Sequence, residues 1–216
     1  RTSLTFRGTT FTIPFPGAFS ILNALAAAVL AEELDVSVKT IAKGLSRMQP
    51  ILGRVEKIDA DQNFLAIVDY AHTPDSLRAL YGAFPGKRKI CVLGNTGGGR
   101  DSWKRPEMGE IADDACAEVI LTDEDPYDED PEKIVREMAA GMKKKPLIIM
   151  DRRAAIRQAV AMARTGDAVL VTGKGTDPYI MAAKGKKIPW SDAAVVREEL
   201  QKLANGSERS AFSVQR

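Results

Sequence analysis

The sequence predicts an α/β protein whose larger part is a doubly wound, mainly parallel β-sheet. Two observations predict this class. From residue 53 onward, strand-like apolar runs alternate with helix-like segments, and such alternation is typical of a parallel sheet with helices on both faces. The residues before 50 differ, because a strand-like stretch is followed there by two helical segments. We therefore expect a domain boundary near residues 50–54.

The N-terminal elements follow from periodicity and capping. Residues 1–13 alternate polar and apolar residues like an edge strand or a hairpin. They lack an initiator methionine, so we expect the chain to begin within a longer protein. Residues 18–34 are rich in alanine and leucine at helical spacing and predict a buried helix. A second helix is predicted over 38–47, because residues 35–37 can cap it and Pro50 follows it.

The alternating part is predicted from its apolar runs and the segments between them. Strands are expected at 55–58, 64–69, 89–93, 118–122, 147–150 and 168–172. Helices are expected at 74–83, 104–115, 131–143, 152–165 and 193–203. Residues 205–216 are polar and without periodicity, which predicts a disordered tail.

Composition excludes several classes of function. Lys+Arg 31 against Asp+Glu 29 leaves a net charge of +2, so no global field draws the chain to nucleic acid or to an anionic membrane. No apolar run approaches the roughly 18 residues of a membrane span, and we expect a cytoplasmic protein. His72 is the single histidine, so no metal site built on histidine ligands is predicted. Cys91 and Cys116 lack C-x-x-C spacing and are expected to be buried free thiols.

The segments after the predicted strands are rich in charged residues, glycine and histidine. They are DYAHTPDS (69–76), GNTGGGRDSWKR (94–105), TDEDPYDEDP (122–131), DRR (151–153) and GKGTDPY (173–179). In a doubly wound sheet, ligands bind where such loops converge at the carboxyl ends of the strands. The sequence therefore predicts one site at one edge of the sheet.

The glycine-rich segment 93–109 has two interpretations. Its glycines could turn backbone N–H groups toward an anion, with Arg100, Lys104 and Arg105 adding positive charge. It could equally be a flexible connector between a strand and a helix. Neither G-x-G-x-x-G nor G-x-x-x-x-G-K-[ST] is matched, so a standard dinucleotide or P-loop site is not supported here.

Asp69 and His72 follow an apolar strand. A carboxylate there suits ribose hydroxyls, and a histidine beside it suits a nucleobase or a phosphate. The alternative is that Thr73 or Asp75 caps the next helix while His72 packs.

The acidic loop after residue 121 could hold a hard cation or an ammonium group. We expect Glu124 and Asp125 to face the crevice and the later acids to cap the helix that begins at Pro131. Asp177 would add an acid at the same edge.

Together these segments resemble the Mur ligase family, the ATP-dependent amide-forming enzymes of peptidoglycan precursor synthesis. The motifs that carry the resemblance are PGAFSILNALAAA (16–28), GRVE (53–56), VDYAHTPDSL (68–77), LGNTGGGRDSWKRPEMGEIA (93–112), TDEDPYDEDP (122–131) and GKGTDPY (173–179). They are most similar to the members that add the third amino acid of the peptide.

The resemblance implies a three-domain enzyme of which this chain is a part. Residues 1–52 would end the central ATP-binding domain, and residues 53–204 would form the C-terminal Rossmann-like domain that binds the amino acid. Such enzymes use ATP and Mg²⁺ to convert the carboxylate of UDP-MurNAc-L-Ala-D-Glu to an acyl phosphate, which the amine of a diamino acid attacks. The P-loop and the Mg²⁺ ligands would lie upstream, so we expect the fragment to be an inactive monomer without catalytic residues of its own.

The resemblance also assigns ATP contacts. Asn23 matches an asparagine near the nucleotide, and Arg54 matches an arginine that reaches the ATP phosphates. Asp69 matches the carboxylate on the ribose, and His72 would lie beside the nucleotide.

For the incoming amino acid, Arg100 matches the arginine that binds its carboxylate. Gly173 and Asp177 match positions that hold its side-chain end, although a glutamate is more usual at 177.

One departure bears on the substrate. Members that add meso-diaminopimelate read D-N-P-R where this chain has Glu124, Asp125, Pro126 and Tyr127. The missing arginine would pair with the distal carboxylate of diaminopimelate, while two acids favour a bare ammonium group. The sequence therefore favours L-lysine.

Two alternatives stay open. The chain could be a free-standing Rossmann-like module that binds a nucleotide or an amino acid without catalysis. It could also belong to another ligase of the superfamily, either the muramoyl-pentapeptide ligase or folylpolyglutamate synthetase. The motifs DYAHTPDS and GGGRD favour the tripeptide-forming members.

Overall fold

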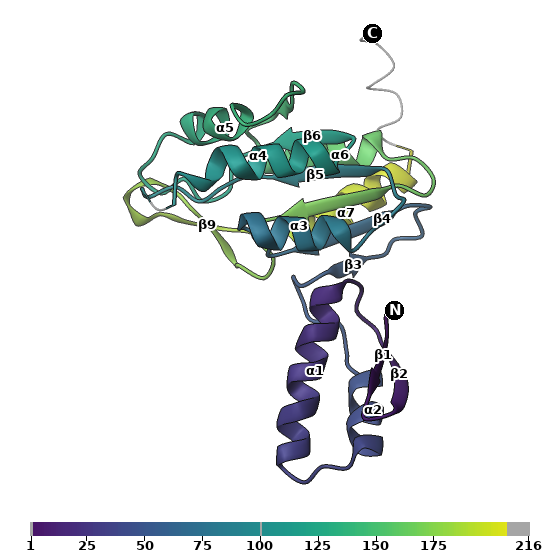
Figure 1. The fold of residues 1–216 in the computed structure, drawn as a ribbon. Coiled ribbons are helices and arrows are strands. Elements are labelled where there is room, and N and C mark those ends of the chain that lie inside the picture. Colours follow the sequence, from purple (N-terminus) through teal and green to yellow (C-terminus); the bar gives the residue numbers. More distant parts are fainter. Residues whose placement is uncertain (1, 100, 207–216) are drawn as a thin grey trace.

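The computed structural model describes residues 2–99 and 101–206, and the largest sheet in that part of the chain has six strands (Figure 1). Their order is β3 (Glu56–Ile58), β4 (Leu65–Asp69), β8 (Ala168–Thr172), β5 (Lys89–Leu93), β6 (Glu118–Leu121) and β7 (Leu147–Ile148). Neighbouring strands are parallel except for β3 with β4. The predicted α/β class with a mainly parallel sheet is confirmed.

Helices cover both faces of this sheet. One face carries α3 (Pro74–Gly82), α4 (Lys104–Ala115) and α5 (Pro131–Ala139), and the other carries α6 (Arg152–Met162) and α7 (Asp192–Ala204). Alternate strand residues divide between the two cores. In β5, Cys91 and Leu93 belong to the first core, and Ile90 and Val92 belong to the second. Burial on both faces explains why the strands are apolar along their whole length.

A smaller unit precedes the sheet. An antiparallel hairpin of β1 (Thr2–Phe6) and β2 (Thr9–Ile13) is followed by α1 (Ala18–Glu33) and α2 (Val38–Ser46). Leu4, Ile13, Ala28 and Ile41 form its own core. Among the described residues, no helix combines the length and the apolar character that crossing a membrane requires. In Figure 1 this unit lies beside β3.

One hairpin escaped the sequence analysis. β9 (Tyr179–Met181) and β10 (Lys187–Pro189) pair antiparallel around a 3₁₀ turn, η1 (Ala183–Gly185). Strands of three residues are too short to show an alternation of polar and apolar residues.

Two helices are shorter than predicted. Beyond α5, the amides of Lys143 and Lys144 donate to the Asp113 carboxylate and so leave the helical pattern. Beyond α6, the amide of Arg164 donates to Asp167. At the C-terminus, Asn205 follows α7 as its cap, and residues 207–216 of the predicted tail lie outside the described residues.

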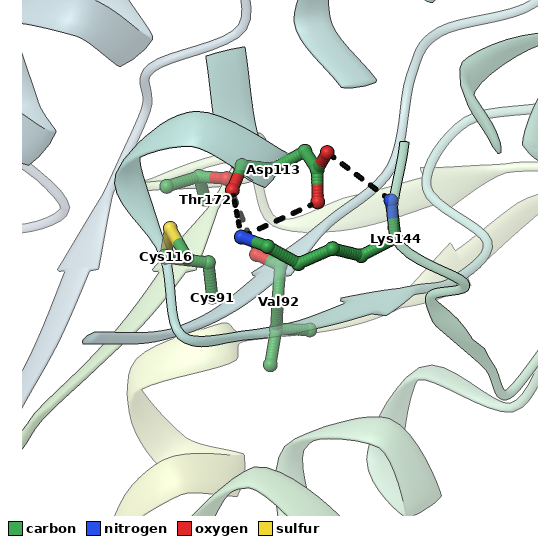
Figure 2. The surroundings of a disulfide bond; sticks show 6 residues. All are labelled: Cys91, Val92, Asp113, Cys116, Lys144 and Thr172. Carbon is green, nitrogen blue, oxygen red and sulfur yellow. Dashed lines mark hydrogen bonds and ion pairs between the residues drawn. A yellow bond between two sulfur atoms is a disulfide. The ribbon is translucent and has the colours of Figure 1, made fainter. Parts of the chain in front are cut away.

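Cys91 and Cys116 form a disulfide bond, with Cα atoms 6.2 Å apart (Figure 2). The prediction of two free thiols is wrong. The two residues are distant in sequence, but Cys116 precedes Ala117, whose amide donates to the Lys89 carbonyl at 2.9 Å. Parallel pairing of β5 with β6 therefore places the two buried sulfur atoms together.

We expect the disulfide to stabilise the fold measurably. It joins residues separated by 25 positions, and closing a loop of that size contributes about 3 kcal/mol. The double variant Cys91→Ala/Cys116→Ala should lower the free energy of unfolding by about 2–4 kcal/mol, measured by denaturant titration. Alkylation of the unfolded, unreduced parent should label neither cysteine, and two labelled thiols would contradict the bond.

The contact between α4 and α5 depends on a glycine. A Cβ added at Gly109 would overlap the main-chain carbonyl of Met138 in α5. We expect Gly109→Ala to destabilise the fold by about 1–3 kcal/mol, because α5 must shift. Gly82→Ala in α3 is the control, since a Cβ there meets nothing within 4 Å. Equal unfolding free energies for the two variants would refute this account of the contact.

Candidate functional site

A cavity of about 590 Å³ lies between the small N-terminal unit and the loop that follows β4. Its volume is typical of a small-molecule site. Polar residues in its lining include Asn23, Arg54, Asp69, Tyr70, His72 and Thr73. The structure thus brings together the four residues predicted to contact ATP, from α1, the segment before β3 and the end of β4.

Asp69 lines this cavity and joins two segments of its wall. It ends β4, is 9% exposed, and accepts hydrogen bonds from the amides of Val55 at 2.7 Å and Ala71 at 2.8 Å. Burial raises the pKa of Asp69, while these two bonds and the charge of Arg54 oppose the rise. The Arg54 guanidinium lies 4.4 Å from the centre of the Tyr70 ring, which keeps a cation at the cavity.

His72 is oriented by its neighbour. Its Nδ1 lies 2.9 Å from the Tyr70 carbonyl oxygen. The His72 and Tyr70 rings meet edge to face, with their centroids 4.7 Å apart. Thr73 caps α3 in a reciprocal pair with Ser76. The capping alternative is therefore confirmed for Thr73, but His72 is half-buried and lines the cavity.

A second pocket, of about 240 Å³, opens at the carboxyl edge of the sheet. It is lined by Tyr70, His72, Thr96, Asp101, Lys104, Glu124, Asp125, Tyr127, Gly173 and Asp177. These residues come from the loops after β4, β5, β6 and β8 and from the start of α4. The predicted convergence is confirmed for these four segments, whereas the DRR segment (151–153) contributes no residue to the lining. Five of the six residues predicted to bind the amino acid meet here, and Arg100 lies outside the described residues. Tyr70 and His72 line both spaces.

Glu124 is a buried acid with unused hydrogen-bonding capacity. It is 2% exposed, and its Oε1 accepts a bond from Thr96 Oγ1 at 3.3 Å. Its Oε2 is buried and has no hydrogen-bond partner in the described part of the chain. A Cβ at Gly173 would overlap this oxygen, so glycine is required opposite it. Burial raises the pKa of Glu124 to about 7, with Arg152 acting in the opposite direction.

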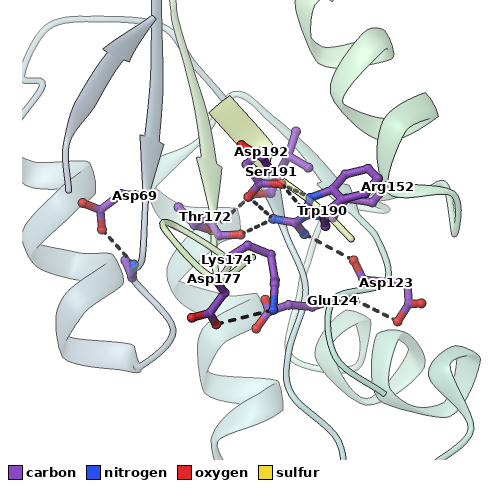
Figure 3. A network of polar contacts seen from close by, with 12 residues as sticks. Asp69, Asp123, Glu124, Arg152, Thr172, Lys174, Asp177, Trp190, Ser191 and Asp192 are labelled. Carbon is purple, nitrogen blue, oxygen red and sulfur yellow. Dashed lines mark hydrogen bonds and ion pairs between the residues drawn. The ribbon is translucent and has the colours of Figure 1, made fainter. Parts of the chain in front are cut away.

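Asp125 already has a cation. Its two oxygens accept bonds from Lys174 Nζ at 2.8 and 2.7 Å, and the Met181 amide donates to it at 2.8 Å. Lys174 is 1% exposed and also lies 3.4 Å from Asp177 (Figure 3). Lys174 was not among the residues predicted for the site, although it stands inside the GKGTDPY motif. Its ammonium neutralises a carboxylate that was expected to meet the substrate.

Two of the glycines after β5, Gly94 and Gly97, allow close packing against the acidic loop. A Cβ at Gly94 would lie 2.6 Å from the Thr122 carbonyl. The amide of Gly97 donates to the Asp125 carbonyl at 2.7 Å. An anion cradle at Gly97 is therefore wrong, because this N–H group is used to hold the acidic loop against the end of β5.

The later acids of the loop have structural partners. Asp130 caps α5 by accepting from the Glu132 amide at 3.0 Å, as predicted. Glu129 instead pairs with the fully buried Arg105, with Nη1 and Oε1 2.7 Å apart. Hydrogen bonding from Arg105 lowers the pKa of Glu129 to about 2.

The comparisons with known proteins agree with this geometry. The family model described as "Mur ligase, glutamate ligase domain" matches residues 53–175. The chain belongs to the Mur ligase family. It is 43% identical over 192 residues to the UDP-N-acetylmuramoyl-L-alanyl-D-glutamate--2,6-diaminopimelate ligase of Syntrophomonas wolfei, covering 86% of this chain and 39% of the relative.

Two further matches extend the Mur ligase comparison. The ligase of the same name from Solibacter usitatus is 38% identical over 208 residues, covering 93% of this chain and 42% of the relative. A solved structure of a ligase with that name has a TM-score of 0.68 at 31% identity, covering 91% of this chain and 41% of the other. The chain thus spans about two fifths of the length of these relatives.

The state of Glu124 predicts a pH dependence of stability. Its folded pKa of about 7 lies above its ordinary value of 4.5. Its protonated form therefore stabilises the fold fully below pH 4.5, and this contribution is lost as the pH rises through 7. Glu124→Gln mimics the protonated acid. Its unfolding free energy relative to the parent should rise by about 2–3 kcal/mol between pH 5 and pH 8, and a pH-independent difference would contradict the buried acid.

Proposed function

We propose that the full-length protein is an ATP-dependent ligase that adds the third amino acid to UDP-MurNAc-L-Ala-D-Glu in peptidoglycan synthesis. The carboxylate of the dipeptide would take a phosphoryl group from ATP, and the amine of a diamino acid would displace phosphate to form the amide. The observation that carries this proposal is the adjacency of two spaces. The cavity at Asp69 and the acidic pocket at Glu124 share Tyr70 and His72, so two substrates can meet.

ATP is assigned to the larger cavity. Asn23, Arg54, Asp69 and His72 line it together, and this set offers a cation for phosphates, a carboxylate for ribose hydroxyls and polar groups for a base. These four side chains together fit the groups of a nucleotide. We assign residues 1–52 to the end of the central ATP-binding domain and residues 53–204 to the C-terminal domain. The P-loop and the Mg²⁺ ligands would lie upstream, and the protein would act as a cytoplasmic monomer.

The diamino acid is assigned to the smaller pocket. Arg100 would hold its α-carboxylate, as the family resemblance suggests. Glu124 and Asp177 would hold the distal ammonium, because Oε2 of Glu124 has no partner in the described chain and Gly173 leaves room beside it. Asp125 would contribute to binding indirectly, by holding Lys174. Tyr127 would contribute through its ring.

We propose L-lysine as the preferred amino acid, with meso-diaminopimelate as the competitor. In the described lining, Asp101 pairs with Lys104 and Asp125 with Lys174. Asp177 shares Lys174 at 3.4 Å, and Glu124 has no ion-pair partner in the described chain. That balance favours a substrate that ends in a cation. The relatives are named as diaminopimelate ligases, so the two amino acids must be compared directly.

The test is ATP-dependent amide formation by the full-length protein with L-lysine, meso-diaminopimelate and ornithine. We expect the highest kcat/KM with lysine. Tyr127→Arg should shift the ratio of the two kcat/KM values toward diaminopimelate by about tenfold or more, because it adds a cation for the distal carboxylate. Tyr179→Arg on the exposed hairpin is the matched control and should leave the ratio unchanged.

Each outcome of this test is informative. A parent that prefers diaminopimelate would overturn the lysine assignment alone. No turnover with any amino acid, together with retained binding of a nucleotide or an amino acid, would favour a non-catalytic module. Turnover with an acceptor other than the muramoyl dipeptide would favour another ligase of the superfamily.

A further inference from the structure

A buried ion pair lies directly behind the acidic pocket. Arg152 begins α6 and is 2% exposed, and Asp192 begins α7 and is fully buried. The guanidinium donates two hydrogen bonds to the Asp192 carboxylate, from Nε at 2.8 Å and from Nη2 at 2.7 Å. Trp190 Nε1 also donates to Asp192 at 2.7 Å, which holds the acceptor in place (Figure 3).

The remaining donors of Arg152 reach the two walls of the pocket. Nη2 donates to the Thr172 carbonyl at 2.7 Å, and Nη1 donates to the Asp123 carbonyl at 3.2 Å. Thr172 ends β8, and Asp123 lies two residues beyond the end of β6. These strands are not neighbours, because β5 lies between them in the sheet. One side chain therefore connects two loops that strand pairing alone does not join.

The two carbonyls that accept from Arg152 belong to the peptide units that directly precede the pocket residues Glu124 and Gly173. The Asp123 carbonyl shares its peptide plane with the amide of Glu124, which donates to the Asp123 carboxylate at 2.8 Å. The Thr172 carbonyl shares its plane with the amide of Gly173, which donates to the Asp69 carbonyl at 3.1 Å. Each peptide unit is therefore held at its carbonyl by Arg152 and at its N–H group by a second hydrogen bond. In the described chain, Glu124 carries the carboxylate oxygen without a hydrogen-bond partner, and Gly173 makes room for that oxygen.

Helix stability does not explain this arginine. A cation in the first turn of α6 faces the positive end of the helix dipole, which is unfavourable. Burying an ion pair also seldom gives net stability over an apolar pair of similar volume. The geometry of its hydrogen bonds offers the better reason for an arginine here, because only the planar fork of a guanidinium can serve a carboxylate and two carbonyls together.

We propose that Arg152, held by Asp192, is a positioning residue that fixes Glu124 opposite Gly173 and so sets the affinity for the incoming amino acid. The proposal rests on the proposed function for its kinetic consequence. Arg152 does not line either pocket in the described structure, so it acts through the two peptide units and not by touching a substrate.

The test compares variants of the full-length protein. Arg152→Lys keeps the charge but loses the fork, and Arg152→Met/Asp192→Leu replaces the pair by apolar side chains that keep the core filled. We expect both to raise KM for the amino acid about tenfold or more, with KM for ATP changed less than twofold. Arg153→Gln is the matched control, because Arg153 is the next residue of α6 and pairs away from the pocket, with Glu198 and with Glu199. Glu199 keeps Lys202 as a partner in this variant, which should therefore behave like the parent.

A second measurement does not depend on turnover. Hydrogen exchange of the peptides that contain the amides of Glu124 and Gly173 should be about tenfold faster or more in both variants and unchanged in Arg153→Gln. Unchanged exchange in folded variants would overturn the proposal. Equal increases of KM for ATP and for the amino acid would also overturn it, since they indicate general damage. If the parent itself shows no turnover, the proposed function fails, and exchange alone decides whether Arg152 positions the two loops.

Discussion

Parallel pairing of the strands is the constraint on which the site depends. Because β4, β8, β5 and β6 run in the same direction, their carboxyl ends and the loops that follow them meet at one edge. Residues as distant in sequence as His72, Glu124 and Asp177 thereby line one pocket. The strands are held by apolar packing, the hydrogen-bond ladder and the Cys91–Cys116 disulfide, and the loops beyond them need further contacts to fix their mutual positions.

Buried cations supply those contacts, and each cation joins a different pair of segments. Arg105 ties the end of the acidic loop to α4, Lys174 ties Asp125 to the loop after β8, and Arg152 ties the start of the acidic loop to the end of β8. A cation buried at each point satisfies carboxylates or carbonyls that would otherwise be costly to desolvate. Among the described residues that line the acidic pocket, Glu124 is the one with a buried oxygen that has no hydrogen-bond partner. It marks the place where a ligand can supply the missing donor.

The sequence predicted the parts of this arrangement that depend on local pattern. Apolar runs identified β5 and β8 at the bounds observed, because strands buried on both faces are apolar throughout. Convergence of the loops followed from topology alone. The partners of the charges could not be predicted, since they depend on which side chains meet in space. Lys174 appeared as part of a glycine motif, and Arg152 as part of the DRR segment without a role of its own. The disulfide was hidden because its cysteines become neighbours only through the pairing of β5 with β6.

The division of roles between the two spaces follows from which loops they share. Tyr70 and His72, after β4, line both the large cavity and the acidic pocket, so a change in this turn must affect both ligands. Glu124 and Gly173 line only the acidic pocket in the described structure, and Arg152 holds the backbone on that side. Under the proposed assignment, the turn after β4 would couple the two ligands, and the wall of Glu124 and Gly173 would belong to the amino acid. On that assignment, selectivity for the amino acid would change at the wall of Glu124 and Gly173 without disturbing the nucleotide, and the departures from the D-N-P-R pattern fall at that wall.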